Sequence, residues 1–142
     1  MKIELDHIGY ATKSIPKSLK TFRALGYEED GPILIDESLG VKIQFINQPL
    51  HHGARIELVE NLPGAIKQPV SVILQQRSGL YHLAYLVDSI RDFSEINDLR
   101  KVNNCGPAVA FNNRHVQFFI SRDGGLLELI AKSLDCECED LA

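Results

Sequence analysis

The chain carries the segment Leu5-Asp6-His7-Ile8-Gly9-Tyr10-Ala11 near its start and a related segment, Leu80-Tyr81-His82-Leu83-Ala84-Tyr85-Leu86, after its midpoint. Two further segments recur in the same order: residues 42–46 return as 115–119, and residues 56–59 return as 127–130. The separation between equivalent residues drifts slightly along the chain, as small insertions and deletions would cause. The sequence therefore predicts a duplicated unit, with a His and a Glu at matching places in each half.

Composition limits the class of protein. Of the 142 residues, 44% are hydrophobic and 24% are charged, which predicts a packed core in a single domain of residues 1–142. The net charge of −4 argues against a nucleic-acid partner, because proteins that bind nucleic acids usually present a basic face. No apolar run is long enough to span a bilayer, and the acidic start of the chain is unlike a signal peptide. We therefore expect a cytoplasmic protein with a small-molecule substrate and no membrane partner.

Each half predicts the same order of elements: a strand, a helix and three more strands. In the first half, Ser14 is a typical helix N-cap, Pro16 suits the first helical turn and Gly26 ends the helix. Strands are predicted there at residues 2–11, 33–35, 41–46 and 54–59. The second half predicts a strand at 81–87, a helix at 89–102, and strands at 109–111, 116–120 and 126–130, with Asn112-Asn113 as a tight turn.

These elements define the predicted organisation of the chain. A first βαβββ module spans residues 3–60, a linker at 61–79 contains a helix at 69–76, and a second module spans residues 80–131. An acidic tail at 132–142 is expected to be disordered. Because one such module leaves one sheet face bare, we expect two copies to pair. The predicted fold class is α+β, with two tandem βαβββ modules forming a cupped mixed sheet around a central metal site.

Strand alternation places the repeated polar residues on one face of the sheet. If His7 points into the cup, Ile8 and Tyr10 point toward the helix. The same parity turns Glu57 inward, and it applies equally to His82 and Glu128. Four polar side chains are thus predicted to line the concave side.

These four residues, His7, Glu57, His82 and Glu128, form a candidate site for a divalent metal. A carboxylate among apolar strand residues costs several kcal/mol unless it is solvated or paired, and a cation would supply the pairing. Mixed nitrogen and oxygen ligation suits one ion of Co²⁺, Ni²⁺, Mn²⁺, Fe²⁺ or Zn²⁺, whereas imidazoles are poor ligands for Ca²⁺. The alternative is a cup lined with hydrogen-bonded polar groups that holds no metal.

Other polar residues have two interpretations each. Gln44 and Gln117 are equivalent across the repeat, and either line the cup or point outward. Arg55, Lys42 and Arg114 either meet an anionic substrate or occupy solvated strand positions.

Over about residues 3–131 the chain resembles the vicinal-oxygen-chelate superfamily. This group of paired βαβββ proteins includes glyoxalase I, methylmalonyl-CoA epimerase, extradiol dioxygenases and bleomycin-resistance proteins. Residues 5–11, 79–85 and the linker 69–75 look most like methylmalonyl-CoA epimerase, and residues 124–129 are similar to the family's closing strand. The resemblance implies that His7, Glu57, His82 and Glu128 are metal ligands, that Glu128 also takes part in proton transfer, and that the chain forms a homodimer as many relatives do.

The chain departs from the epimerase pattern at several points. Some bacterial epimerases carry a second acid/base Glu two residues after a Gly-Val pair, whereas here Gly40-Val41 is followed by Lys42 and Ile43. The loops at residues 103–107 and 121–125 are also shorter than in the family.

The combined interpretation is a metal-dependent isomerase or lyase that moves a proton alpha to a carbonyl of a small acid or acyl thioester. The metal would act as a Lewis acid, and Glu128 would move the proton. Two alternatives stay open: a glyoxalase-type lyase that acts on a hemithioacetal, and a metal-free binding protein of the same fold.

Overall fold

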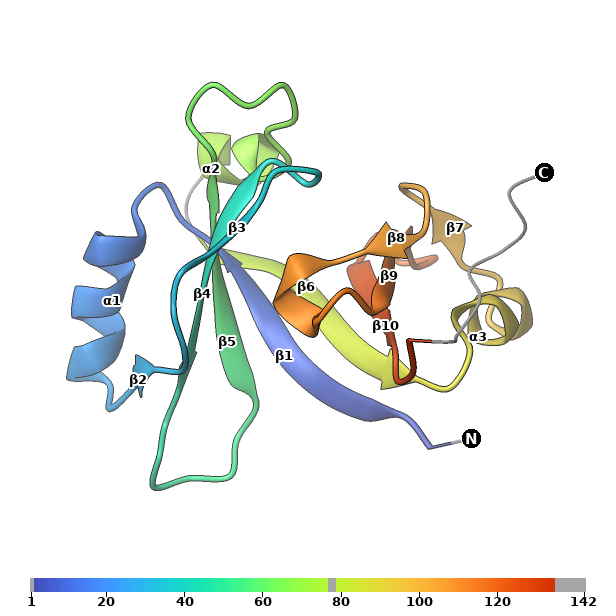
Figure 1. Cartoon of the computed structure of the whole chain (residues 1–142), viewed down its shortest axis with the longest axis horizontal. Coiled ribbons are helices and arrows are strands. Elements are labelled where there is room, and N and C mark those ends of the chain that lie inside the picture. Colours follow the sequence, from blue (N-terminus) through green and yellow to red (C-terminus); the bar gives the residue numbers. More distant parts are fainter. Residues whose placement is uncertain (1, 77–78, 135–142) are drawn as a thin grey trace. The chain divides into compact units, whose positions relative to one another are not determined.

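The computed structural model describes residues 2–76 and 79–134 (Figure 1). By its internal contacts the chain divides into two compact units. The first unit is His7–Tyr81, and the second combines Met1–Asp6 with His82–Ala142. Within the described ranges, no helix has both the length and the hydropathy needed to cross a membrane.

The first unit is a mixed sheet with one long helix on it. Its elements are β1 (Glu4–Ala11, in this unit from His7 on), α1 (Ile15–Ala24), β2 (Glu28–Glu29), β3 (Leu34–Asp36), β4 (Val41–Asn47), β5 (Arg55–Asn61) and α2 (Ser71–Gln76). The strand order is β2-β4-β5-β1, and β3 also pairs with β4. β1 and β5 are parallel and β4 and β5 are antiparallel. The helix predicted at residues 69–76 is present as α2, which begins at Ser71.

The second unit repeats this topology. Its elements are β6 (Gly79–Val87, in this unit from His82 on), α3 (Ile90–Ile96), β7 (Arg100–Lys101), β8 (Gly106–Pro107), a 3₁₀ helix (Val109–Phe111), β9 (His115–Ile120) and β10 (Leu126–Ala131). The order β7-β9-β10-β6 matches β2-β4-β5-β1, with β8 in the place of β3. The parallel and antiparallel pairings also match. The predicted duplication and the mixed α+β class are therefore confirmed.

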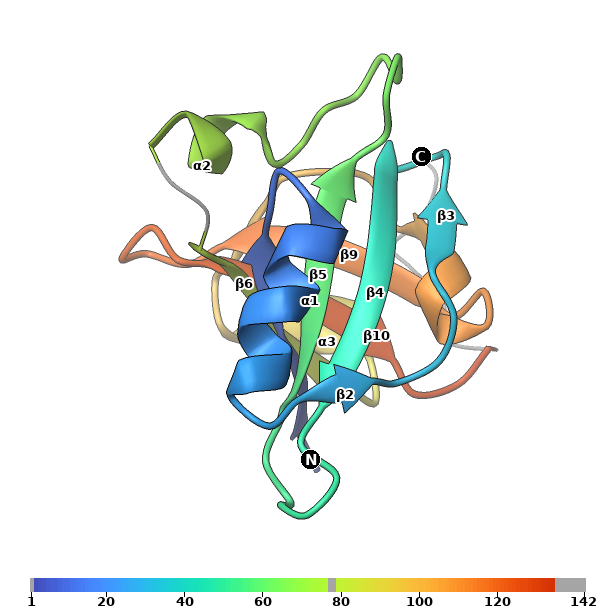
Figure 2. The same cartoon turned by 90° about the vertical axis from the view of Figure 1, so that its left-hand side faces the viewer.

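Each unit packs its core between its helix and one face of its sheet. In the first unit, Ile15 and Leu19 of α1 pack on Ile46 and Leu58, and Figure 2 shows α1 in front of β5. In the second unit the core residues are Val87, Ile90, Phe119, Leu129 and Ala131. Because strand residues alternate between faces, His7, Glu57, His82 and Glu128 lie on the faces away from the helices. The predicted parity is confirmed.

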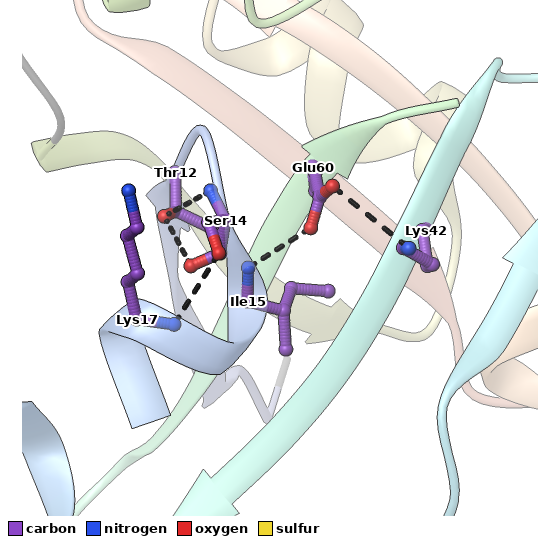
Figure 3. A network of polar contacts seen from close by, with 6 residues as sticks. All are labelled: Thr12, Ser14, Ile15, Lys17, Lys42 and Glu60. Atoms are coloured by element: carbon purple, nitrogen blue, oxygen red, sulfur yellow. Dashed lines mark hydrogen bonds and ion pairs between the residues drawn. The ribbon is translucent and has the colours of Figure 1, made fainter. Parts of the chain in front are cut away.

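The start of α1 is fixed by more groups than the sequence suggested. Ser14 caps the helix as predicted, since its hydroxyl accepts a hydrogen bond of 3.3 Å from the Lys17 N–H. The Glu60 carboxylate of β5 accepts a second bond, of 2.9 Å, from the Ile15 N–H. Glu60 also pairs with Lys42 of β4 at 3.8 Å, so one carboxylate ties the helix to two strands (Figure 3).

One predicted strand of the second unit is wrong, and its predicted helix is present but shorter than expected. Residues 109–111 form a 3₁₀ helix instead of a strand, because the pairing with β9 is already made by β8. Asn112 and Asn113 do adopt the left-handed conformation expected of a turn, with φ of 54° and 64°. The helix predicted to reach residue 102 ends at Ile96. Two residues later Asp98 adopts the left-handed conformation, with φ of 53°, which is typical of the end of a helix.

The predicted tail begins with three described residues, 132–134. Lys132 pairs with Asp88 at 3.3 Å. The rest of the tail, residues 135–142, lies outside the described part of the chain, so its predicted disorder stays a prediction.

Candidate functional site

In the first unit a histidine and a glutamate from neighbouring parallel strands meet on the sheet face away from α1. His7 of β1 and Glu57 of β5 are both buried, and His7 Nε2 lies 3.5 Å from Glu57 Oε2. The strand register explains this contact. Glu57 lies beside Gly9, which is two positions along β1 from His7 and on the same face.

The second unit repeats the arrangement. His82 of β6 and Glu128 of β10 are both buried, and His82 Nε2 lies 3.0 Å from Glu128 Oε2. Glu128 lies beside Ala84, again two positions along the parallel strand from its histidine. Each unit therefore brings together the two site residues that the sequence predicted for it.

A phenylalanine ring lies beside the histidine of each His–Glu pair. Phe45 lies opposite Glu57 across the antiparallel strands, and its ring meets the His7 ring edge-on, with 5.5 Å between centroids and 79° between planes. Phe118 lies opposite Glu128 and meets the His82 ring at 5.2 Å and 84°. We call these groups the His-Phe-Glu clusters: His7, Phe45 and Glu57 in the first unit, and His82, Phe118 and Glu128 in the second.

Sequence reasoning missed the two rings. Phe45 and Phe118 follow the repeated Gln44 and Gln117 in segments that the duplication had already aligned. Their equivalence was a signal that could have identified them. Without the register across the strands, however, an apolar residue in a strand is most simply a core residue.

The chemistry of each cluster follows from its burial. A carboxylate removed from water is costly unless it is paired, and the imidazole supplies a partner in each cluster. Each cluster offers one imidazole nitrogen and one carboxylate oxygen, which are donors that divalent transition ions accept. His and Glu are also the side chains most often used in general acid–base catalysis. The donor set thus fits both metal binding and proton transfer.

The repeated glutamines belong to the other face of each sheet. The Gln44 side-chain amide donates to the Gly31 carbonyl at 2.9 Å, and the Gln117 amide donates to the Asn103 carbonyl at 2.8 Å. Both side chains are buried. Each therefore holds the loop between the two short strands that pair with its own strand, and the interpretation of these residues as cup residues is wrong.

The three cations that the sequence singled out have different surroundings. Lys42 pairs with Glu60 on the helix side of the first sheet, and the Arg114 Nε donates to the Phe111 carbonyl at 3.1 Å. Arg55 lies on the face of the first cluster, with its guanidinium carbon 4.0 Å from the centre of the Phe45 ring. Among these three, Arg55 is the cation beside a cluster.

Comparison with known protein families gives one match. Residues 6–118 match the family described as the Glyoxalase/Bleomycin resistance protein/Dioxygenase superfamily. The matched range includes both histidines, Glu57 and both cluster phenylalanines. Comparison with curated protein sequences gives no significant match.

Solved structures share the fold. A hypothetical protein from Bacillus halodurans C-125 is 29% identical, with a TM-score of 0.77, over 97% of this chain and 100% of that chain. Methylmalonyl-CoA epimerase from Mycobacterium tuberculosis is 22% identical, with a TM-score of 0.74, over 91% of this chain and 87% of that one. A variant of Streptomyces coelicolor methylmalonyl-CoA epimerase in complex with 2-nitronate-propionyl-CoA is 20% identical, with a TM-score of 0.71, over 91% and 96%.

Proposed function

Because the chain belongs to the Glyoxalase/Bleomycin resistance protein/Dioxygenase superfamily, we propose that it is a divalent-metal-dependent isomerase or lyase. Its reaction moves a proton alpha to a carbonyl of a small acid or acyl thioester. The observation that carries the proposal is the buried His–Glu pair that recurs, with the same strand register, in both units. The likeness of the fold to methylmalonyl-CoA epimerases supports an acyl thioester as the first substrate to test.

In this proposal the two clusters act together and hold one metal ion. The ligands would be His7, Glu57, His82 and Glu128, which all lie buried on strands. Two imidazoles and two carboxylates suit Co²⁺, Ni²⁺, Mn²⁺, Fe²⁺ or Zn²⁺. When bound, such an ion stabilises negative charge that develops on a carbonyl oxygen.

The proton is moved by Glu128 in this mechanism. Its carboxylate would accept the proton from the carbon beside the carbonyl and later return it, and its Oε2 lies 3.0 Å from His82 Nε2. Phe118, opposite Glu128, contributes an apolar wall that limits the access of water to the exchanging proton.

One observation favours the second candidate, a glyoxalase-type reaction on a hemithioacetal. The position of the second acid/base Glu of some epimerases is taken by Ile43, whose side chain is buried and cannot exchange a proton. A single carboxylate can carry a proton from one carbon to its neighbour, whereas epimerisation requires a proton donor on each side of one carbon. Proton exchange assays should therefore include both acyl thioesters and hemithioacetals.

The first test is metal content, measured by elemental mass spectrometry on the purified protein. We expect about one divalent transition ion per chain and its loss in the double variant His7→Ala/His82→Ala. The matched control is His51→Ala/His52→Ala, which removes two exposed histidines outside the clusters and should leave the metal in place. A wild type that binds no metal after reconstitution with Co²⁺ or Ni²⁺ would overturn the proposal and favour a metal-free binding protein.

The proposed partner is a small molecule, and the proposed assembly is a homodimer. Sedimentation equilibrium measures the mass of the species in solution, and this mass can be compared with the 15.9 kDa of one chain. A species of that mass across the working concentration range would contradict the dimer without touching the proposed reaction.

A further inference from the structure

A phenylalanine lies on the cluster face of each sheet, where the packing of the helix does not explain an aromatic residue. Phe45 and Phe118 each lie opposite their cluster glutamate in the antiparallel register, so they share its face and point away from the helix. The next residues along the strands, Ile46 and Phe119, belong to the helix–sheet cores instead. Within this repeated segment, only the glutamine and the phenylalanine are identical in both halves. Both halves thus carry the same ring at the same place beside the cluster.

The two rings meet their imidazoles in the same way. The planes of Phe45 and His7 are 79° apart, with 5.5 Å between ring centres. Those of Phe118 and His82 are 84° apart, with 5.2 Å between centres. A perpendicular contact at this distance is a favoured arrangement of two aromatic rings, because the positive edge of one ring meets the negative face of the other. The contact therefore restrains the plane of each imidazole.

The carboxylate and the phenylalanine restrain the same imidazole in different directions. In the second unit, His82 Nε2 lies 3.0 Å from Glu128 Oε2, so this end of the ring faces the carboxylate. A contact at one end still allows the ring plane to rock, since the terminal torsion of a histidine side chain has a broad range. The perpendicular Phe118 ring opposes that motion. The plane of the imidazole and the direction of its Nε2 are thus set by two different neighbours.

We propose that Phe45 and Phe118 are positioning residues, which hold the imidazoles of His7 and His82 in the orientation that binds the metal ion. This inference rests on the proposed function, because it assigns these imidazoles to a metal. A ligand that is already oriented loses less conformational freedom when the ion binds, so the ion binds more tightly. Neither phenylalanine needs to touch the ion or the substrate to have this effect.

The competing explanation is that the two rings are apolar filling, which only keeps water away from the clusters. Leucine separates the two explanations, because it is also apolar and excludes water but has no aromatic ring. Phe119→Leu is the matched control for Phe118→Leu. It is the same change one position along β9, in the core that includes Ile90 of α3, so it perturbs the strand on the face away from His82.

The first measurement is the motion of the His82 ring in the metal-free, full-length protein, from NMR relaxation of the isotopically labelled imidazole carbons. The His82 signal is identified by its absence from His82→Ala. In the wild type we expect an order parameter of about 0.85, as in rigid groups of folded proteins, and in Phe118→Leu a value below about 0.6. Phe119→Leu should leave the ring as rigid as in the wild type, and so should Phe118→Tyr, which keeps the aromatic ring.

The second measurement is the affinity for Co²⁺, followed by the visible absorption of the bound ion. We expect Phe118→Leu to weaken Co²⁺ binding about twofold to tenfold, the factor that corresponds to one edge-to-face contact between rings. Phe45→Leu tests the first unit in the same way, and the double variant should multiply the two losses. Phe119→Leu should bind Co²⁺ within about twofold of the wild type.

The outcomes separate this inference from the proposed function. If Phe118→Leu changes neither the ring motion nor the Co²⁺ affinity, or if Phe119→Leu changes both equally, the positioning role is overturned while the metal site stands. A looser ring with unchanged Co²⁺ affinity also overturns it, since the orientation would then not matter to the ion. If the wild type binds no Co²⁺, the proposed function fails, and the ring motion alone decides whether Phe118 holds the imidazole. Should Phe118→Leu fold poorly in thermal denaturation, Phe118→Met takes its place, because a flexible apolar chain fills the same volume without a ring.

Discussion

At the scale of single residues, the two cluster glutamates are equivalent in position but have different roles in the proposed mechanism. Glu57 and Glu128 make the same contact with their histidines, at 3.5 and 3.0 Å, yet only Glu128 is proposed to move a proton. Glu128→Gln keeps the size and an oxygen ligand but cannot accept the proton. We therefore expect deuterium exchange at the α-carbon, followed by NMR, to fall at least about a hundredfold.

The matched control for this prediction is Glu57→Gln, the same change in the other unit. We expect it to retain most of the exchange rate while it weakens metal binding. If Glu57→Gln abolishes exchange and Glu128→Gln does not, the base is in the first unit and the assignment is reversed. Metal content of both variants, measured in parallel, separates loss of the ion from loss of the base.

Some residues of the clusters could be predicted from the sequence and others could not. The histidines and glutamates could be predicted because a charged or polar side chain repeated among apolar strand residues needs a reason. Phe45 and Phe118 could not, because only the strand register places them opposite the glutamates. Arg55, Lys42 and Arg114 had equal standing in the sequence, and only their partners in the structure separate them.

At the scale of elements, the turn between β3 and β4 depends on one glycine. Gly40 has φ of +73°, and a Cβ added there would lie 2.3 Å from the Lys67 carbonyl oxygen. Its N–H donates to the Asp36 carbonyl at 2.9 Å, and its own carbonyl accepts from Leu62 at 2.9 Å. Gly40→Ala must therefore both strain the backbone and displace the segment that contains Lys67.

We expect Gly40→Ala to lower the free energy of unfolding by at least about 2 kcal/mol, because the left-handed strain alone costs about 1–2 kcal/mol and the backbone contact adds to it. Urea denaturation measures the change. Gly31→Ala is the control, since Gly31 has φ of +88° but nothing within 4 Å of an added Cβ. Equal losses in the two variants would mean that the approach of Lys67 adds nothing.

The elements also show what local patterns can predict. The long strands and the capped start of α1 follow from alternation, Ser14 and Pro16, which are local signals. The edge strand of the second unit was misplaced, because β8 is only Gly106–Pro107 and is defined by its partner β9 rather than by its own composition. The position of a short edge strand is determined by the strand with which it pairs, so it cannot be predicted from the residues of the short strand alone.

At the scale of the whole molecule, the duplication explains why one ion would need both halves. A single unit supplies one imidazole and one carboxylate, which is fewer than the three or four protein ligands typical of a transition-metal site. In the proposed function the ion is therefore bound only by the folded chain with both units intact. Metal binding should then stabilise the protein against unfolding, since the unfolded chain has no such site.

This linkage gives the sharpest test of the four-ligand proposal. At an ion concentration about 100 times Kd, binding adds about 2.7 kcal/mol to the free energy of unfolding and raises Tm by several degrees. We expect Co²⁺ to raise the Tm of the wild type, measured by circular dichroism. His7→Ala/Glu57→Ala and His82→Ala/Glu128→Ala should each abolish the rise, because each leaves only half of the ligands. If either variant keeps the full rise, the ion is held by one unit alone, and the two clusters do not act together.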